Sequence, residues 1–171
     1  MEMNYCRRCG KVLTKIDDHT YKCENGHMVF ANPSPTVGVF FVDDDNNVML
    51  AVRGEEPGKG MSDSFGGFLN EGENFEDALR RELQEELGLE PNEYSELQYL
   101  TNGVSHYVWG GESKALVGVF YWSRLLTDRE LTASDDVAAI RTVNINDIDL
   151  NDFSSEDNKQ AIEKLRTILL S

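Results

Sequence analysis

Residues 67–89 read GFLNEGENFEDALRRELQEELGL and contain a helical pattern. Apolar residues recur at every fourth position, which predicts one apolar stripe along a helix from residue 75 to residue 87. The positions concerned are Phe75, Leu79, Leu83 and Leu87. Gly88 follows the last of them, where glycine commonly ends a helix in a left-handed conformation. The stretch therefore predicts an amphipathic helix packed on the core of the protein.

Three glutamates, Glu82, Glu85 and Glu86, are expected on the side of this helix opposite the apolar stripe. At ~100° per residue, positions i, i+3 and i+4 fall within a sector of ~100°. Carboxylates held so close repel one another, and two interpretations are open. The first is a solvated acidic face on which Arg80 and Arg81 pair with the glutamates. The second is a cation site, because Mg²⁺ is held by a few carboxylates together with substrate phosphates.

The same stretch matches the Nudix box, G-x5-E-x7-R-E-U-x-E-E-x-G-U with U an aliphatic residue, at every fixed position. A chance match would occur on the order of once in 10⁸ starting positions. On this motif the chain resembles the Nudix hydrolases. The resemblance covers most of residues 36–170 and implies an α/β fold, the Nudix α/β/α sandwich around a mixed sheet.

The resemblance also implies roles for individual residues. The ligands of a catalytic Mg²⁺ or Mn²⁺ would be Glu82, Glu85, Glu86 and, from the Gly66-Gly67 turn, the backbone carbonyl of Gly67. Glu73 and Arg81 would pair and fix the loop against the helix, although Glu73 could reach a metal instead. A box glutamate or an acidic residue of a later loop would take the proton from the attacking water. The candidates in later loops are Glu130, Asp135 and Asp136.

Outside the box, apolar runs and turn residues predict the remaining elements. Strands are expected over residues 36–42, 48–52, 97–100, 115–122 and 139–143. Residues 53–67 are rich in glycine, proline and charge, which predicts a loop. A second helix is expected over residues 156–170, with an inner face made of Ile162, Leu165, Ile168 and Leu169.

All three cysteines lie near the N-terminus, where their spacing indicates a structural zinc site. The expected ligands are Cys6, Cys9, Cys23 and His27, with His19 as the alternative fourth ligand. A redox pair at Cys6 and Cys9 is the competing interpretation. Such a closed site would stabilise a segment too small to fold on its own core. We therefore expect a small zinc ribbon over residues 1–34, followed by a Nudix hydrolase domain over residues 35–171.

The charge of the chain is distributed unevenly. The net charge is −15, yet residues 1–34 hold five basic and four acidic side chains, so the remaining residues carry a net charge of −16. The acidic charge of residues 35–171 disfavours nucleic acid as a partner, since proteins bind the phosphates of nucleic acids through Lys and Arg. It would also repel an anionic substrate unless divalent cations lie between the two. With no long apolar run and no secretory signal, we expect no membrane partner and a cytoplasmic location.

A ribbon followed by a Nudix box is similar to zinc-ribbon Nudix proteins, a group that includes NADH pyrophosphatases. Those enzymes carry a proline-rich SQPWPFPxS signature after the box, whereas residues 100–113 read LTNGVSHYVWGGES and contain no proline. The expected function is therefore divalent-metal-dependent hydrolysis of the diphosphate linkage in a nucleoside diphosphate joined to another group, such as ADP-ribose. The alternatives are a house-cleaning nucleoside triphosphate pyrophosphatase, an NADH pyrophosphatase, and a non-catalytic Nudix module that senses a ligand.

Four residues outside the box are candidates for contacts with a small nucleotide substrate. Arg53 and Lys59 lie between a strand and the box, where they could reach phosphate, although either could be an ordinary surface charge. Tyr107 and Trp109 could stack on a base, although aromatic residues in strands more often serve packing. Many relatives are dimers, so a homodimer is also expected.

Overall fold

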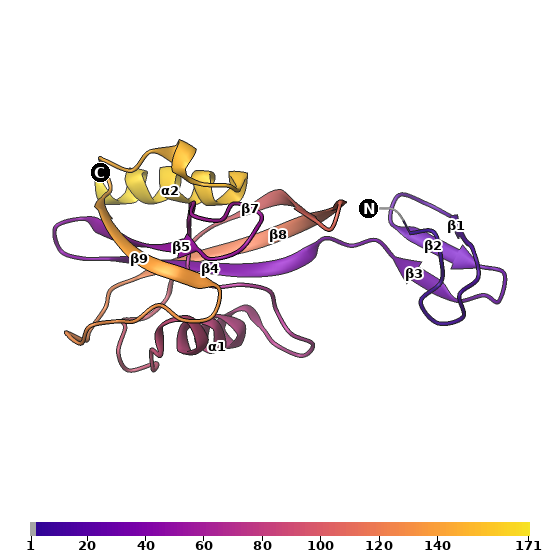
Figure 1. Ribbon diagram of the computed structural model, residues 1–171, viewed down its shortest axis with the longest axis horizontal. Coiled ribbons are helices and arrows are strands. Elements are labelled where there is room, and N and C mark those ends of the chain that lie inside the picture. Colours follow the sequence, from indigo (N-terminus) through magenta and orange to yellow (C-terminus); the bar gives the residue numbers. More distant parts are fainter. Residues whose placement is uncertain (1–2) are drawn as a thin grey trace.

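The computed structural model describes residues 3–171, which form a large mixed sheet and a small separate one (Figure 1). The large sheet contains β4 (Ser34–Val42), β5 (Asn47–Arg53), β6 (Ser62–Asp63), β7 (Gln98–Trp109), β8 (Glu112–Ser123) and β9 (Val137–Asn144). Its order is β6-β5-β4-β8-β7, and β9 pairs with β5. The central pair β4 and β8 is parallel, and the other pairs are antiparallel.

One helix covers each face of this sheet (Figure 1). Helix α1 is Phe75–Leu87, helix α2 is Glu156–Leu169, and a short 3-10 turn, η1 (Leu150–Asp152), precedes α2. Along β4, Val39 faces the cluster around α1, whereas Phe40 faces the cluster around α2. Because β4 is buried on both faces, its sequence is a continuous apolar run rather than an alternating one. The predicted α/β/α sandwich around a mixed sheet is confirmed.

Local sequence explains both ends of α1. The Asn74 side chain accepts a hydrogen bond from the Asp77 backbone N–H, and Gly88 adopts a left-handed conformation with φ of 60°. These are an N-cap and a C-cap, which satisfy backbone groups that the helix leaves unpaired. The predicted helix over residues 75–87 is therefore confirmed to the residue.

Two sequence predictions were wrong in detail. Strand β7 runs to Trp109, far beyond the predicted residue 100, because it continues into a hairpin with β8 through Gly110 and Gly111, both with positive φ. Ile168 was predicted on the inner face of α2 but is 37% exposed. It lies in the last turn of the helix, at the margin of the core, where Leu169 packs instead.

The small sheet lies beyond the start of β4 (Figure 1). It comprises β1 (Leu13–Lys15), β2 (Thr20–Cys23) and β3 (Met28–Phe30) in antiparallel order. Its buried apolar residues are Cys6, Leu13, Cys23 and Val29. A cluster of this size buries too little surface to stabilise a fold unaided. No helix in residues 3–171 is both long and apolar enough to cross a membrane.

Candidate functional site

Glu86 is the most deeply buried carboxylate of α1. Its exposed fraction is 2%, and its Oε2 accepts a hydrogen bond from the Gly66 N–H at 3.0 Å. The prediction that it lies opposite the apolar stripe was wrong, since at ~100° per residue position 86 falls between Phe75 and Leu79, within that stripe. Burial, together with the nearby charges of Asp136 and Glu82, raises the pKa of Glu86 to about 9.

Arg81 joins the two other glutamates of the helix. Its Nη1 donates to Glu82 Oε1 at 2.8 Å and to Glu85 Oε2 at 2.9 Å. Glu82 is half-buried and Glu85 is exposed. Burial raises the pKa of Glu82, although Arg81 opposes the shift. The structure thus brings the three glutamates to one side of α1 with a single guanidinium between two of them.

Glu73 lies in the loop before α1 and pairs with the same arginine. Arg81 Nε donates to Glu73 Oε1 at 2.7 Å and Arg81 Nη2 donates to Glu73 Oε2 at 3.0 Å, a bidentate arrangement. These bonds lower the pKa of Glu73 to about 2. Arg81 Nη2 also donates to the Phe68 carbonyl at 2.9 Å, so this side chain fastens the loop to the helix.

The Gly66-Gly67 turn passes close to α1. The Gly67 carbonyl accepts from the Val37 N–H at 2.9 Å, and its second lone pair can still take a metal, so its role as a ligand stays a prediction. A Cβ on Gly67 would lie 2.6 Å from Glu82 Oε1. Gly66 has φ of +132°, and a Cβ there would lie 2.2 Å from the Val37 carbonyl oxygen. Only glycine therefore allows this approach of the loop to the carboxylates.

The donor set around α1 has the chemistry of a hard-cation site, although among the described residues only Cys6, Cys9, Cys23 and His27 form a group whose ligand atoms already lie together. Glu82, Glu86 and Asp136 each have a raised pKa, with burial as the largest cause. Neighbouring carboxylates raise these values further, although Arg81 opposes the shift at Glu82 and Arg53 opposes it at Asp136. Carboxylate oxygens are the ligands that Mg²⁺ and Mn²⁺ prefer, and a cation here would relieve both the burial and the repulsion.

A cavity of about 280 Å³ opens beside the glutamates. Gly66, Gly67 and Asp136 line its end near α1, and Arg53 and Tyr107 line it as well. Of the residues predicted to contact substrate, Arg53 and Tyr107 are therefore placed together. Lys59 and Trp109 lie outside the cavity lining, with Lys59 exposed and Trp109 64% exposed.

Among the acidic residues of later loops, the structure distinguishes one. Asp136 lines the cavity and is close enough to Glu86 to raise its pKa. Asp136, Asp135 and Glu130 are all exposed, and only Asp136 lines the cavity.

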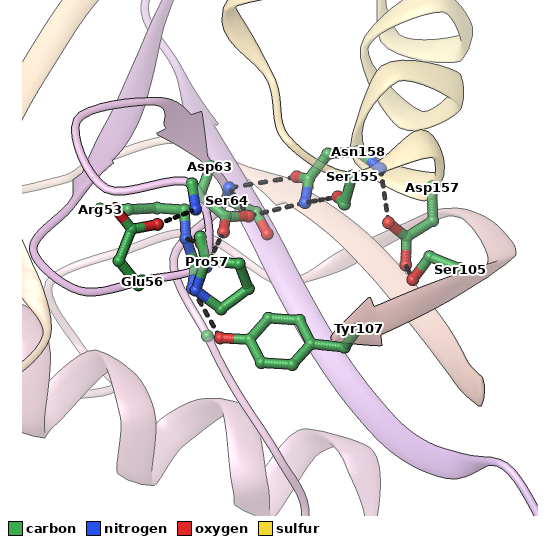
Figure 2. A network of polar contacts seen from close by, with 12 residues as sticks. Arg53, Glu56, Pro57, Asp63, Ser64, Ser105, Tyr107, Ser155, Asp157 and Asn158 are labelled. Atoms are coloured by element: carbon green, nitrogen blue, oxygen red, sulfur yellow. Dashed lines mark hydrogen bonds and ion pairs between the residues drawn. The ribbon is translucent and has the colours of Figure 1, made fainter. Parts of the chain in front are cut away.

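Several polar residues of the cavity were not identified from the sequence (Figure 2). Asp63 comes from β6, Ser105 from β7, and Asp157 and Asn158 from the first turn of α2. Asp157 and Asn158 are buried, and Asp157 accepts from the Ser105 hydroxyl at 2.9 Å. Polar residues in a first helical turn usually signal capping, so the sequence contains no local sign that these two line a cavity.

The cysteine cluster forms at the end of the molecule that holds the small sheet. Cys6, Cys9, Cys23 and His27 place their ligand atoms within 4.8 Å of one another, and Cys9 Sγ lies 3.8 Å from Cys23 Sγ. Tetrahedral zinc with Zn–S bonds of ~2.3 Å requires sulfurs about 3.8 Å apart, so the cluster fits zinc. His19 is exposed and lies beside Asp17, with Nδ1 3.4 Å from the carboxylate, so the structure brings His27 rather than His19 to the cysteines.

A mixed sheet lies between two helices, one of which carries the buried Glu86 and the half-buried Glu82 beside a cavity. The chain is therefore an α/β protein with a candidate metal-dependent site. Residues 32–165 match the NUDIX domain family, and the chain belongs to that family.

Two curated proteins share part of the sequence. The chain is 31% identical over 87 residues to human mitochondrial NAD(P)H pyrophosphatase NUDT13, covering 50% of this chain and 24% of that protein. It is 33% identical over 81 residues to an ADP-ribose pyrophosphatase of Methanocaldococcus jannaschii, covering 47% of this chain and 44% of that protein. The chain thus matches less than half the length of each of these relatives.

Solved structures show the same fold at low identity. A NUDIX hydrolase from Nitrosomonas europaea superposes with a TM-score of 0.70 at 18% identity, covering 96% of this chain and 91% of that one. The NUDIX domain of Shewanella oneidensis NrtR, solved with ADP ribose, superposes with a TM-score of 0.63 at 23% identity, covering 82% and 90%.

Proposed function

We propose that the protein is a divalent-metal-dependent hydrolase that cleaves the diphosphate linkage of a nucleoside diphosphate joined to another group, with ADP-ribose as the main candidate. One observation carries this proposal: a cavity lined by Asp136 and by a single arginine suited to phosphate reaches the Gly66-Gly67 turn, which is hydrogen-bonded to Glu86. The two curated relatives, a NAD(P)H pyrophosphatase and an ADP-ribose pyrophosphatase, support the same reaction class.

In this proposal Glu82, Glu85 and Glu86 hold Mg²⁺ or Mn²⁺. When bound, the metal supplies charge neutralisation at the phosphates and a nucleophilic water at neutral pH. Arg81 orients Glu82 and Glu85, and its pair with Glu73 keeps the loop on α1. Asp136 is the later-loop residue best placed to accept the proton of the attacking water, because it lines the cavity beside Glu86. Arg53 binds the diphosphate.

Product analysis tests the proposal. The protein is incubated with Mg²⁺ and, separately, with ADP-ribose, NADH and dGTP, and the products are separated by chromatography. We expect AMP and ribose 5-phosphate from ADP-ribose. Cleavage of NADH as the best substrate would favour the NADH pyrophosphatase alternative, and pyrophosphate from dGTP would favour the triphosphate alternative. If all three compounds remain intact, the result points instead to a module that binds a ligand without hydrolysis.

Gly67→Ala is expected to weaken metal binding while the fold is retained. The new Cβ would meet the end of the Glu82 side chain at 2.6 Å, so the carboxylate must move while the backbone can stay. We expect the Mg²⁺ concentration for half-maximal hydrolysis to rise about tenfold, as for displacement of one ligand-orienting contact. Titration of activity with Mg²⁺ measures this, and Glu71→Ala, at an exposed position of the same loop, is the control. An unchanged Mg²⁺ requirement in Gly67→Ala would remove Glu82 from the ligand set.

The domain organisation is a further part of the proposal: a zinc ribbon over residues 1–34 and a Nudix hydrolase domain over residues 35–171. The large sheet begins one residue before this proposed boundary, because Ser34 of β4 already pairs with Leu116 of β8. Zinc at the Cys6, Cys9, Cys23 and His27 cluster, a homodimer and a cytoplasmic location remain predictions.

A further inference from the structure

Three acceptors from different segments hold the Arg53 guanidinium (Figure 2). Nη1 donates to Asp63 Oδ2 at 2.5 Å, Nε donates to the Pro57 carbonyl at 2.8 Å, and Nη2 donates to the Tyr107 hydroxyl at 2.8 Å. A guanidinium has five N–H donors. These contacts therefore leave one N–H on each terminal nitrogen for a further acceptor.

Arg53 is also the only Lys or Arg among the described residues that line the cavity. Its side chain is 16% exposed, and the acidic residues lining the cavity are Asp63, Asp136 and Asp157. In a chain of net charge −15, an anionic ligand in this cavity has one protein cation to contact. Binding of that ligand therefore depends on the direction in which the free N–H groups of Arg53 point.

Asp63 is itself fixed by two parts of the fold. Its Oδ1 accepts from the Ser64 N–H at 2.9 Å and from Asn158 Nδ2 at 2.6 Å. Asn158 Nδ2 also donates to the Ser155 hydroxyl at 2.8 Å, and Asn158 Oδ1 accepts from the Ser64 N–H at 3.1 Å. The start of α2 therefore holds Asp63, and Asp63 holds Arg53 (Figure 2).

Tyr107 contacts Arg53 through its hydroxyl rather than its ring face. The Arg53 Cζ atom lies 5.7 Å from the ring centroid, a distance that already follows from the hydroxyl contact. The ring meets Phe68 and Trp109 in edge-to-face arrangements, with centroids 6.5 Å apart in both cases. The residue thus has a defined polar partner, which the prediction of base stacking did not include.

We propose that Tyr107 and Asp63 are positioning residues, which hold the Arg53 guanidinium so that its two remaining N–H groups face the diphosphate of the substrate. This inference rests on the proposed hydrolysis of a nucleoside diphosphate. Tyr107 acts through Arg53, and its own ring makes no stacking contact on which substrate affinity depends. The two residues contribute to binding of the substrate and not to the bond cleavage itself.

A double-mutant cycle tests the role of Tyr107. Arg53→Ala should raise the KM for ADP-ribose about 10- to 100-fold, as for loss of a charge-assisted hydrogen bond, with a smaller change in kcat. Tyr107→Phe should raise KM about 3- to 10-fold. The double variant should match Arg53→Ala alone, because Tyr107 has nothing left to position. Tyr99→Phe, a loss of hydroxyl on an exposed residue of the same strand, should leave KM unchanged.

Three outcomes would overturn the inference in an enzyme that hydrolyses ADP-ribose. The first is a double variant in which the KM effects of Tyr107→Phe and Arg53→Ala multiply. The second is a Tyr107→Phe variant in which only kcat changes, and the third is a Tyr107→Phe variant with unchanged KM and kcat. Failure of the wild type to hydrolyse any of the three nucleotides would instead count against the proposed function.

A second readout needs no turnover. The Nε–H signal of Arg53 in nuclear magnetic resonance spectra, assigned by its loss in Arg53→Lys, should shift or broaden in Tyr107→Phe and in Asp63→Asn, and should stay fixed in Tyr99→Phe. An unchanged signal in Tyr107→Phe would overturn the positioning role even if Asp63→Asn fails to fold.

Discussion

Glu86→Gln is expected to reduce hydrolysis about 10³-fold or more while the protein keeps its fold. The loss of one anionic ligand removes charge that holds the metal, and metal catalysis contributes several kcal/mol of transition-state stabilisation. Glutamine has nearly the same shape, and its carbonyl oxygen can still accept the hydrogen bond from the Gly66 N–H. Steady-state hydrolysis of ADP-ribose measures the loss, with Glu163→Gln on the exposed side of α2 as the control.

The same substitution should stabilise the protein when divalent metal is absent. Burial raises the pKa of Glu86 from its ordinary value of 4.5 to about 9 in the folded state. An acid with a raised folded-state pKa loses stability as pH rises from its unfolded value toward its folded value. In EDTA, the Tm of Glu86→Gln minus that of the wild type should therefore increase from pH 5 to pH 8. A Tm of Glu86→Gln below that of the wild type at pH 8, or hydrolysis by Glu86→Gln near the wild-type rate, would contradict the place given to Glu86.

The sequence predicted α1 to the residue because its signals are local. Leucines at every fourth position define one stripe, and Gly88 supplies the left-handed cap. The prediction misplaced Glu86 because it counted apolar residues alone, whereas at ~100° per residue position 86 falls within the stripe. Its burial depends on the Gly66-Gly67 turn, which lies against the helix only in the folded protein.

The cavity was harder to predict, since its polar residues are far apart in the sequence. Asn158 contacts Asp63 across a separation of 95 residues, and Tyr107 contacts Arg53 across 54. Strand β7 was predicted too short because its second half is rich in polar residues and lacks the apolar run that marked β8. Without that strand, Ser105 and Tyr107 could not be placed on the face toward α2.

Removal of zinc is expected to unfold the small sheet and leave the large sheet intact. Two of the four buried apolar residues of the small sheet, Cys6 and Cys23, are themselves ligand candidates, so the metal site and the apolar core share residues. Structural zinc in comparable small folds contributes about 10–16 kcal/mol of apparent binding free energy at neutral pH, far more than two remaining apolar side chains can. No residue of the small sheet lines the cavity among the described residues, so hydrolysis should change less than about twofold.

His27→Asn and His19→Asn form a matched pair for this prediction. His27 lies 3.7 Å from Cys6 Sγ through its Nδ1, whereas His19 lies on the surface beside Asp17. Elemental analysis should find about one zinc per chain in the wild type and in His19→Asn, and much less in His27→Asn, since a structural site uses four ligands. Hydrogen exchange should show protected amides in β1, β2 and β3 only where zinc is bound. A metal-free chain in which these strands stay protected would mean that the cysteines pack as apolar residues and that the fold of this segment does not depend on zinc.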